Sequence, residues 1–311
     1  MRAEGIDPVR PSGHSAPVPP PVVPSLAASD EGEAAGRAAT VGASGSPTWD
    51  PASYARFGDE RSRPFVDLMA RVGARHPRHV VDLGCGSGAL TATLKERWPA
   101  AQVHGVDSSA EMVAAAADLD TDVVFTQGDV RSWRPALSDA PVDVIVSNAV
   151  LQWVPEHRDL LPRWTSCLAS GGWLAVQVPG NFEAPSHALM REVADRPAFR
   201  VALAGVLRGG DSVDDPAGYA DRLAAAGCRV DAWETTYLHV LDPAGEHGDD
   251  AVLAWVSGTG LRPVLDALAG DDELQEEFVQ QYRDELRRAY PRRHWGTPLP
   301  FRRVFVVAQR P

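Results

Sequence analysis

Short apolar runs alternate with amphipathic stretches from about residue 60 onward, and this alternation predicts the secondary structure. Runs rich in valine, isoleucine and leucine are typical of buried strands, whereas apolar residues spaced three and four apart predict helices. The predicted strands are 79–83, 102–106, 123–126, 142–147, 173–178, 229–240 and 304–308. The predicted helices are 60–75, 88–97, 109–117, 157–169 and 217–227.

Strands that alternate with helices in this way build a parallel sheet covered on both faces. We therefore predict an α/β protein with a doubly wound, mostly parallel, seven-stranded sheet. A long excursion separates the last two strands, which favours an antiparallel hairpin at one edge of the sheet. The excursions 183–216 and 242–300 are too long for loops and have helical spacing, so we expect a helical cap over the carboxyl ends of the strands.

Residues 1–47 differ from the rest, because they are rich in proline, alanine, glycine and serine and precede the first aromatic residue, Trp49. Such a segment buries too little apolar surface to offset its ordering entropy, so we predict a disordered tail and a folded part over 48–311. A secretory signal is not expected, since no continuous apolar stretch follows the N-terminal charges. A proline run in the tail leaves partner binding open as a weaker alternative.

Composition narrows the functional classes. The three cysteines have no metal-ligand spacing, so we expect neither a zinc site nor a disulfide framework, and a reduced cytoplasmic protein is the default. No apolar run reaches the roughly 18 residues needed to span a bilayer. The net charge of −12 disfavours a nucleic-acid partner. We expect a monomer or weak homo-oligomer that acts on a small molecule.

The strongest chemical signal is the loop after the first predicted strand, which runs Asp82-Leu83-Gly84-Cys85-Gly86-Ser87-Gly88. Glycines let a backbone approach a ligand closely. The second predicted strand also ends at an acid, Asp107, whose carboxylate suits the two hydroxyls of a ribose. A glycine loop and a ribose carboxylate together predict a bound nucleoside.

Two nucleosides compete for this crevice. A dinucleotide fits the glycine spacing formally, but a lone glycine motif is weak support. Asp82 would repel a pyrophosphate and would favour a ligand that carries a cation. S-adenosylmethionine carries an ammonium and a sulfonium and no phosphate, and the run Asp82–Gly88 resembles the first motif of class I methyltransferases. We therefore predict S-adenosylmethionine as the methyl donor, with no metal.

Two later strands also end in polar residues, Asp129 and Asn148, and parallel sheets bind ligands at the carboxyl ends of their strands. The resemblance to class I methyltransferases places an acid such as Asp129 at the adenine amine. The predicted donor-binding residues are Asp82, Gly84, Gly86, Gly88, Asp107, Ser108, Met112, Asp129, Val130 and Asn148.

From residue 48 onward the chain resembles the trans-aconitate methyltransferases. The resemblance rests on the segments 49–54, 60–64, 148–155, 174–179, 189–194, 235–239 and 259–263. It implies methyl transfer from S-adenosylmethionine to a carboxylate of trans-aconitate, giving a monomethyl ester. Agreement is least over 291–303.

A tricarboxylate acceptor needs a local cationic pocket in so acidic a protein, and the fork of arginine pairs well with carboxylates. The predicted acceptor-binding residues are Tyr54, Arg63, Trp153, His187, Arg191, Arg262 and Arg302. A carboxylate nucleophile is already ionised at pH 7, so we predict in-line displacement without a general base or other catalytic side chain. Another small acid, a natural-product hydroxyl or a non-enzymatic nucleoside-binding role remain the alternatives.

Overall fold

The computed structural model describes residues 58–135 and 141–311, which lie in a unit that spans Ser46–Pro311. The predicted tail 1–47 and the predicted acceptor residue Tyr54 lie outside the described residues. Within the two described ranges, no helix is both long enough and apolar enough to cross a membrane.

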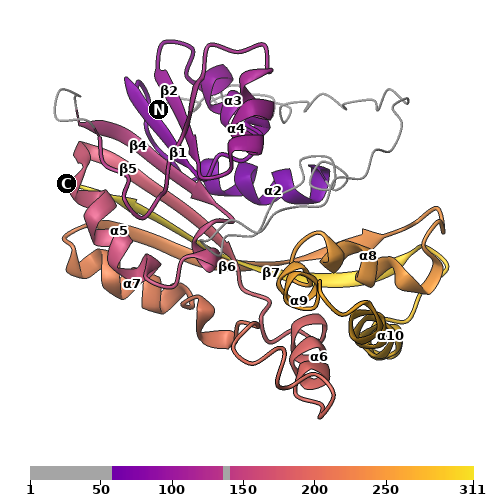
Figure 1. The fold of residues 1–311 in the computed structure, drawn as a ribbon. Coiled ribbons are helices and arrows are strands. Elements are labelled where there is room, and N and C mark those ends of the chain that lie inside the picture. The colour runs from indigo at the N-terminus through magenta and orange to yellow at the C-terminus, as the bar shows by residue number, and fades with distance from the viewer. Residues whose placement is uncertain (1–57, 136–140) are drawn as a thin grey trace, which may run out of the picture. The chain divides into compact units, whose positions relative to one another are not determined.

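A seven-stranded sheet forms the centre of this unit, in the order β3-β2-β1-β4-β5-β7-β6 (Figure 1). The strands are β1 (His79–Leu83), β2 (Gln102–Asp107), β3 (Val124–Gln127), β4 (Val142–Asn148), β5 (Leu168–Pro179), β6 (Arg229–Leu241) and β7 (Thr297–Gln309). The first five strands are parallel to their neighbours, and β7 runs antiparallel to both β5 and β6. The predicted fold is therefore confirmed, with the hairpin of β6 and β7 at one edge.

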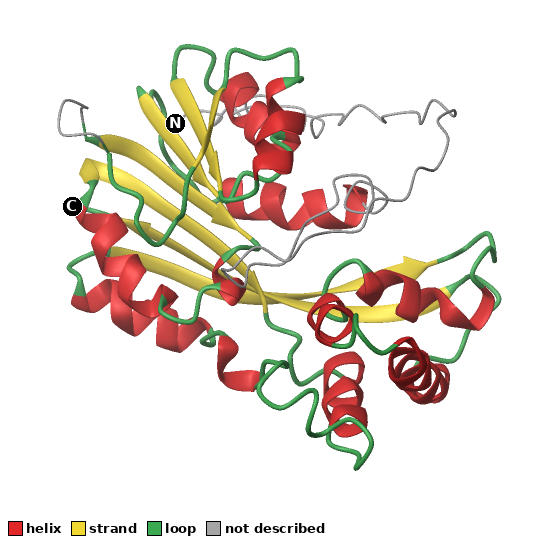
Figure 2. Ribbon diagram, in the orientation of Figure 1, coloured by secondary structure: helices red, strands yellow, loops and turns green. Residues whose placement is uncertain are grey.

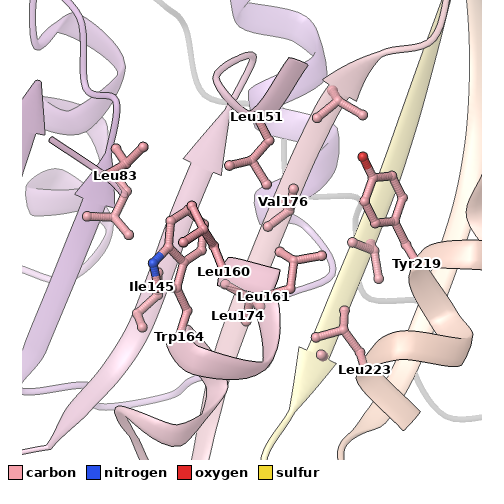
Figure 3. Close-up of a cluster of buried hydrophobic side chains, with 14 of the residues drawn as sticks. Leu83, Ile145, Leu151, Leu160, Leu161, Trp164, Leu174, Val176, Tyr219 and Leu223 are labelled. Carbon is pink, nitrogen blue, oxygen red and sulfur yellow. The ribbon is translucent and has the colours of Figure 1, made fainter. Parts of the chain in front are cut away.

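Helices cover both faces of the sheet, as Figure 2 shows. One face carries α2 (Gly58–Met69), α3 (Ala89–Arg97) and α4 (Ala110–Ala117), and the other carries α5 (His157–Ser166) and α7 (Pro216–Ala225). Trp164 of α5 and Tyr219 of α7 are fully buried in the same apolar cluster as Ile145 and Leu174 of the sheet (Figure 3). Parallel strands buried on both faces need this continuous apolar sequence.

The β6–β7 hairpin extends beyond the end of β5 and carries a second set of helices (Figure 1). These are α6 (Pro185–Ala194), α8 (Ala251–Ser257), α9 (Arg262–Ala267) and α10 (Asp272–Ala289), with short 3₁₀ turns η1 (Leu151–Trp153), η2 (Gly210–Ser212) and η3 (Gly248–Asp250) elsewhere in the chain. Their buried faces share one apolar cluster with the outer hairpin, which includes Trp255, Phe278 and Tyr282. The helices fall within the two excursions that the sequence predicts as a cap.

Several predicted boundaries differ from the structure. Strand β7 begins at Thr297 rather than at 304, and α5 ends at Ser166 rather than at 169. The helix predicted to reach residue 75 ends at Met69, where the guanidinium of Arg97 donates to the carbonyls of Met69 (2.6 Å) and Val72 (2.9 Å). These bonds satisfy carbonyls that a longer helix would have paired internally. Strand β5 starts at Leu168 rather than at 173, because residues 168–172 belong to the same long strand, whose pairing with β4 shifts register there.

The fully buried Trp164 sets a test of the core. Trp164→Ala should lower the free energy of unfolding by about 3–5 kcal/mol, because a large cavity replaces the indole. Trp295, which is 40% exposed, provides the matched control, and Trp295→Ala should cost less than about 1 kcal/mol. Urea unfolding followed by circular dichroism measures both, and equal losses would contradict this packing.

Candidate active site

Asp82 lies at the carboxyl end of β1 and is almost completely buried. Thr91, near the start of α3, donates a hydrogen bond from Oγ1 to Asp82 Oδ2 over 2.7 Å, whereas Oδ1 is buried without a hydrogen-bond partner. Burial raises the pKa of Asp82 to about 7, the bond from Thr91 opposes this rise, and the nearby charge of Asp107 adds to it. A buried carboxyl group with one unshared oxygen is suited to receive a cationic ligand.

The glycine loop joins β1 to α3, and other residues of the protein pack closely against both of its ends. Gly84 and Gly88 have φ values of +86° and +81°, which favour glycine. A Cβ on Gly84 would lie 2.1 Å from Val150, and one on Gly88 would lie 2.7 Å from Phe125. A Cβ on Gly86 would meet no atom within 4 Å. The middle of the loop is therefore open where a ligand is predicted.

Asp107, at the end of β2, ties this loop to the next helix. Its Oδ2 accepts the backbone N–H of Gly86 over 2.9 Å, and its Oδ1 accepts that of Ser109, also over 2.9 Å. Ser109 in turn caps α4. Each carboxylate oxygen can accept a further bond, so the arrangement fits the two hydroxyls of a ribose. Asp82, Gly86 and Asp107 thus offer partners for the charged and sugar parts of the donor.

The residues predicted at the adenine vary in their surroundings. Met112 and Val130 are buried, whereas Ser108 is exposed. The carboxylate of Asp129 is paired with Arg131, whose Nε lies 2.8 Å from Oδ2, and this bond lowers the pKa of Asp129. The contact between Asp129 and the adenine amine stays a prediction.

The carboxyl ends of β4 and β5 carry unpartnered polar groups. Asn148 stands opposite Gln177 in the sheet, and neither Asn148 Oδ1 nor either amide atom of the fully buried Gln177 has a hydrogen-bond partner. Ala149 follows with φ +58°, an uncommon conformation for a residue with a side chain. Buried polar groups are usually paired, so we expect this edge of the sheet to face a ligand. Gln177 is not among the predicted site residues, although it is a polar residue that interrupts the apolar run 173–178.

Two predicted acceptor residues, His187 and Arg191, lie one turn apart on α6 and line the same small pocket. Phe182, Arg208 and Gly260 also line it, and the cavity measures about 20 Å³. Arg191 donates to the carbonyl of Phe182 over 2.6 Å and pairs with a carboxylate in the preceding loop at 3.0 Å. The charge of Arg191 is therefore partly compensated within the protein.

His187 is neutral in this pocket. Burial, and then the charges of Arg208 and Arg191, lower its pKa to about 4. Its Nδ1 lies 3.4 Å from Asn181 Nδ2 and 3.2 Å from Ser186 Oγ. An amide nitrogen can only donate, so Nδ1 accepts and the proton of the neutral ring is assigned to Nε2.

Arg208 completes the pocket and is absent from the sequence predictions. Its guanidinium lies 3.7 Å from the ring centroid of Trp153 and 5.5 Å from that of Phe182, and it donates to the carbonyl of Gln152. Burial lowers its pKa to about 10, so it remains charged at neutral pH. Among the described residues no carboxylate pairs with it. Its sequence surroundings did not distinguish it from the other arginines.

Two other predicted acceptor residues form ion pairs within the protein. Arg262 pairs with Asp266 on the same helix at 3.1 Å. Arg302 donates to Glu234 from Nε over 2.9 Å and to the carbonyl of Gly180 over 3.0 Å. Neither lines the pocket, so their contacts with an acceptor stay predictions.

Arg63 projects from α2 rather than from the pocket walls. Its guanidinium lies 5.0 Å from the ring centroid of Tyr237, whose hydroxyl donates to Asp67 over 2.6 Å. The structure therefore brings His187, Arg191 and, through Arg208, Trp153 together, and places Arg63 on another element.

Comparisons with known proteins identify the family of this chain. A family described as a methyltransferase domain matches residues 80–172, which include the glycine loop. The trans-aconitate 2-methyltransferase of Streptomyces coelicolor is 54% identical over 273 residues, which are 85% of this chain and 88% of the relative. The enzyme of the same name from Rhodococcus jostii is 53% identical over 263 residues, covering 84% and 99%.

One solved structure supports the fold. A chain from the complex between the Haloferax volcanii Trm112 methyltransferase activator and a methyltransferase has a TM-score of 0.50 and 19% identity. The similarity covers 84% of this chain and 95% of that chain. On the identity and coverage of its sequence relatives, this chain belongs to the trans-aconitate 2-methyltransferase family.

Proposed function

We propose that this protein transfers the methyl group of S-adenosylmethionine to one carboxylate of trans-aconitate, as the names of its relatives imply. The products are a monomethyl ester and S-adenosylhomocysteine. The structural observation that supports the donor best is the buried Asp82 beside an open glycine loop, with one carboxyl oxygen unshared. We place the enzyme in the cytoplasm, acting on a small molecule as a monomer or weak homo-oligomer.

The donor-side residues divide the nucleoside between them. Asp82 would hold the ammonium, and Asp107 would accept the ribose hydroxyls while it keeps Gly86 in place. Gly84 and Gly88 fix the loop by close contact with their neighbours. The amide of Asn148 stands at the end of β4, where it would border the reacting methyl.

The reaction needs positioning more than acid–base chemistry. The bond from a carboxylate oxygen to the methyl carbon forms as the carbon–sulfur bond breaks, and the electron pair of that bond stays on sulfur. The ionised carboxylate requires no base, and the low pKa of His187 makes this ring a poor one. In-line alignment can contribute about 7–11 kcal/mol, and water exclusion by the cap helices would add to it.

Methyl transfer to carboxylic acids is the direct test of this function. The purified protein, supplied with S-adenosylmethionine and a panel of mono-, di- and tricarboxylic acids, should esterify trans-aconitate with one S-adenosylhomocysteine released per ester. NMR identifies the carboxylate that is modified. Turnover confined to hydroxyl-bearing acceptors would contradict the proposal.

Donor affinity should depend on pH through Asp82. The free carboxyl has a raised pKa of about 7, and an ammonium-bearing ligand requires the ionised form. Below pH 7 the carboxyl must therefore release a proton when the ligand binds. The Kd of S-adenosylhomocysteine should then rise by up to about tenfold for each unit by which the pH falls. Calorimetry between pH 6 and 8.5 measures this dependence.

Two variants control this measurement. Asp82→Asn should bind the donor weakly, and its plot of log Kd against pH should lack the change of slope (the break) near pH 7. Thr91→Val should move the break to higher pH, because the hydrogen bond from Thr91 lowers the pKa of Asp82. A wild-type Kd that is constant from pH 6 to 8 is incompatible with the assigned role.

Turnover at saturating concentrations of both substrates should be independent of pH from about 7.5 to 9. Both the acceptor carboxylate and Asp82 are ionised over this range, and the mechanism uses no group that titrates within it. Single-turnover methyl transfer gives the rate. A rise with a midpoint inside the range would indicate a general base and would favour a hydroxyl acceptor.

A further inference from the structure

The pocket at α6 contains a half-buried cation, Arg208, whose charge no described carboxylate neutralises. The guanidinium of Arg208 lies close to the rings of Trp153 and Phe182, and it donates a hydrogen bond to the carbonyl of Gln152. A guanidinium carries five N–H donors, and the others of Arg208 form no hydrogen bond with the residues that the structure describes. A partly desolvated cation with spare N–H donors is suited to bind an anionic group.

We propose that Arg208 and His187 form a subsite for one of the two carboxylates of the acceptor that do not react. This inference rests on the proposed function and assigns a residue to it. The pocket offers the guanidinium of Arg208 and the Nε2–H of His187, which faces Gly260: a Cβ built on Gly260 would lie 3.1 Å from Nε2. Both groups donate hydrogen bonds, which suits a carboxylate.

The volume of the cavity shows whether it can hold the whole acceptor or only a part of it. About 20 Å³ holds a single water-sized group. A carboxylate oxygen fits such a space, whereas the six-carbon acceptor does not. The subsite therefore receives one end of the acceptor, and the rest of the molecule lies outside it.

The subsite is linked through direct contacts to the donor loop. Gly84 is close-packed against Val150, which begins the short segment that leads to Gln152 and Trp153. Arg208 contacts both of these residues. On the other side, the chain passes from β5 into α6, where His187 lies (Figure 1). An acceptor anchored here extends toward the carboxyl ends of β4 and β5, where Asn148 and Gln177 have unpartnered groups.

The experiment compares Arg208→Gln, Arg208→Lys and Arg288→Gln. Arg288 is 68% exposed in a surface pair on α10 and provides the matched control. Kinetics with trans-aconitate and with the dicarboxylate itaconate are combined with calorimetric Kd values for S-adenosylhomocysteine. We expect Arg208→Gln to raise the KM for trans-aconitate at least tenfold and to leave the donor Kd within twofold. Arg208→Lys, which keeps the charge without the fork, should be intermediate.

Comparison of the two acceptors separates anchoring from a packing defect. Loss of an anchor should reduce the preference for the tricarboxylate over the dicarboxylate, whereas a packing defect would weaken both equally. An Arg208→Gln enzyme that folds and keeps the wild-type KM for trans-aconitate overturns the subsite and leaves the proposed function standing. If Arg208→Gln does not fold, the same comparison with Arg208→Lys and with His187→Phe decides the question.

A binding measurement keeps the two proposals distinguishable. If the wild-type protein does not methylate trans-aconitate, the proposed function fails. Calorimetry with propane-1,2,3-tricarboxylate on the complex with S-adenosylhomocysteine then tests the subsite alone. Binding that is lost in Arg208→Gln and kept in Arg288→Gln supports the subsite. Absence of binding to the wild-type protein, or equal binding to all variants, overturns it.

Discussion

The carboxyl group of Asp82 is buried in the middle of the sheet, and the arrangement around it follows from the cost of placing a charge there. Thr91 compensates one oxygen and no protein group compensates the other. The free protein meets this cost by holding the proton more tightly, which is why the pKa of Asp82 rises. A cationic ligand reverses the balance, since it favours the ionised form. Donor binding and the protonation of the crevice are therefore coupled.

Parallel topology brings the other polar groups to the same place. Asp82 and Asp107 end neighbouring strands, and the in-register pair of Asn148 and Gln177 ends the next two. None of these side chains is close to the others in sequence, yet the sheet aligns their strand ends at one edge. The adjacent hairpin reverses direction and continues past this edge, where it supports the helices that carry the acceptor pocket.

The strands, the donor loop and the hairpin could be predicted because their signals are local: apolar runs, glycines and strand-terminal acids. The presence of His187 and Arg191 in one pocket could also be predicted, since residues four apart share a helix face. The roles of the other arginines could not, because distant residues decide whether a guanidinium is neutralised. Glu234 forms an ion pair with Arg302, whereas Arg208 contacts aromatic rings and donates a hydrogen bond to a carbonyl. The sequence does not encode that difference within any short window.

The length of the hairpin also has a mechanical consequence. Strand β7 is paired with β5 only over Arg303–Gln309, while its pairing with β6 continues to Thr297. The outer helices therefore pack on the part of the hairpin that has only two strands, and two-stranded ribbons twist more strongly than wider sheets. Arg302, bonded to Glu234 of β6 and to the carbonyl of Gly180 just past β5, stands where the third strand stops. Through these two bonds Arg302 connects β6, β7 and the end of β5 at the junction between the wide sheet and the two-stranded ribbon.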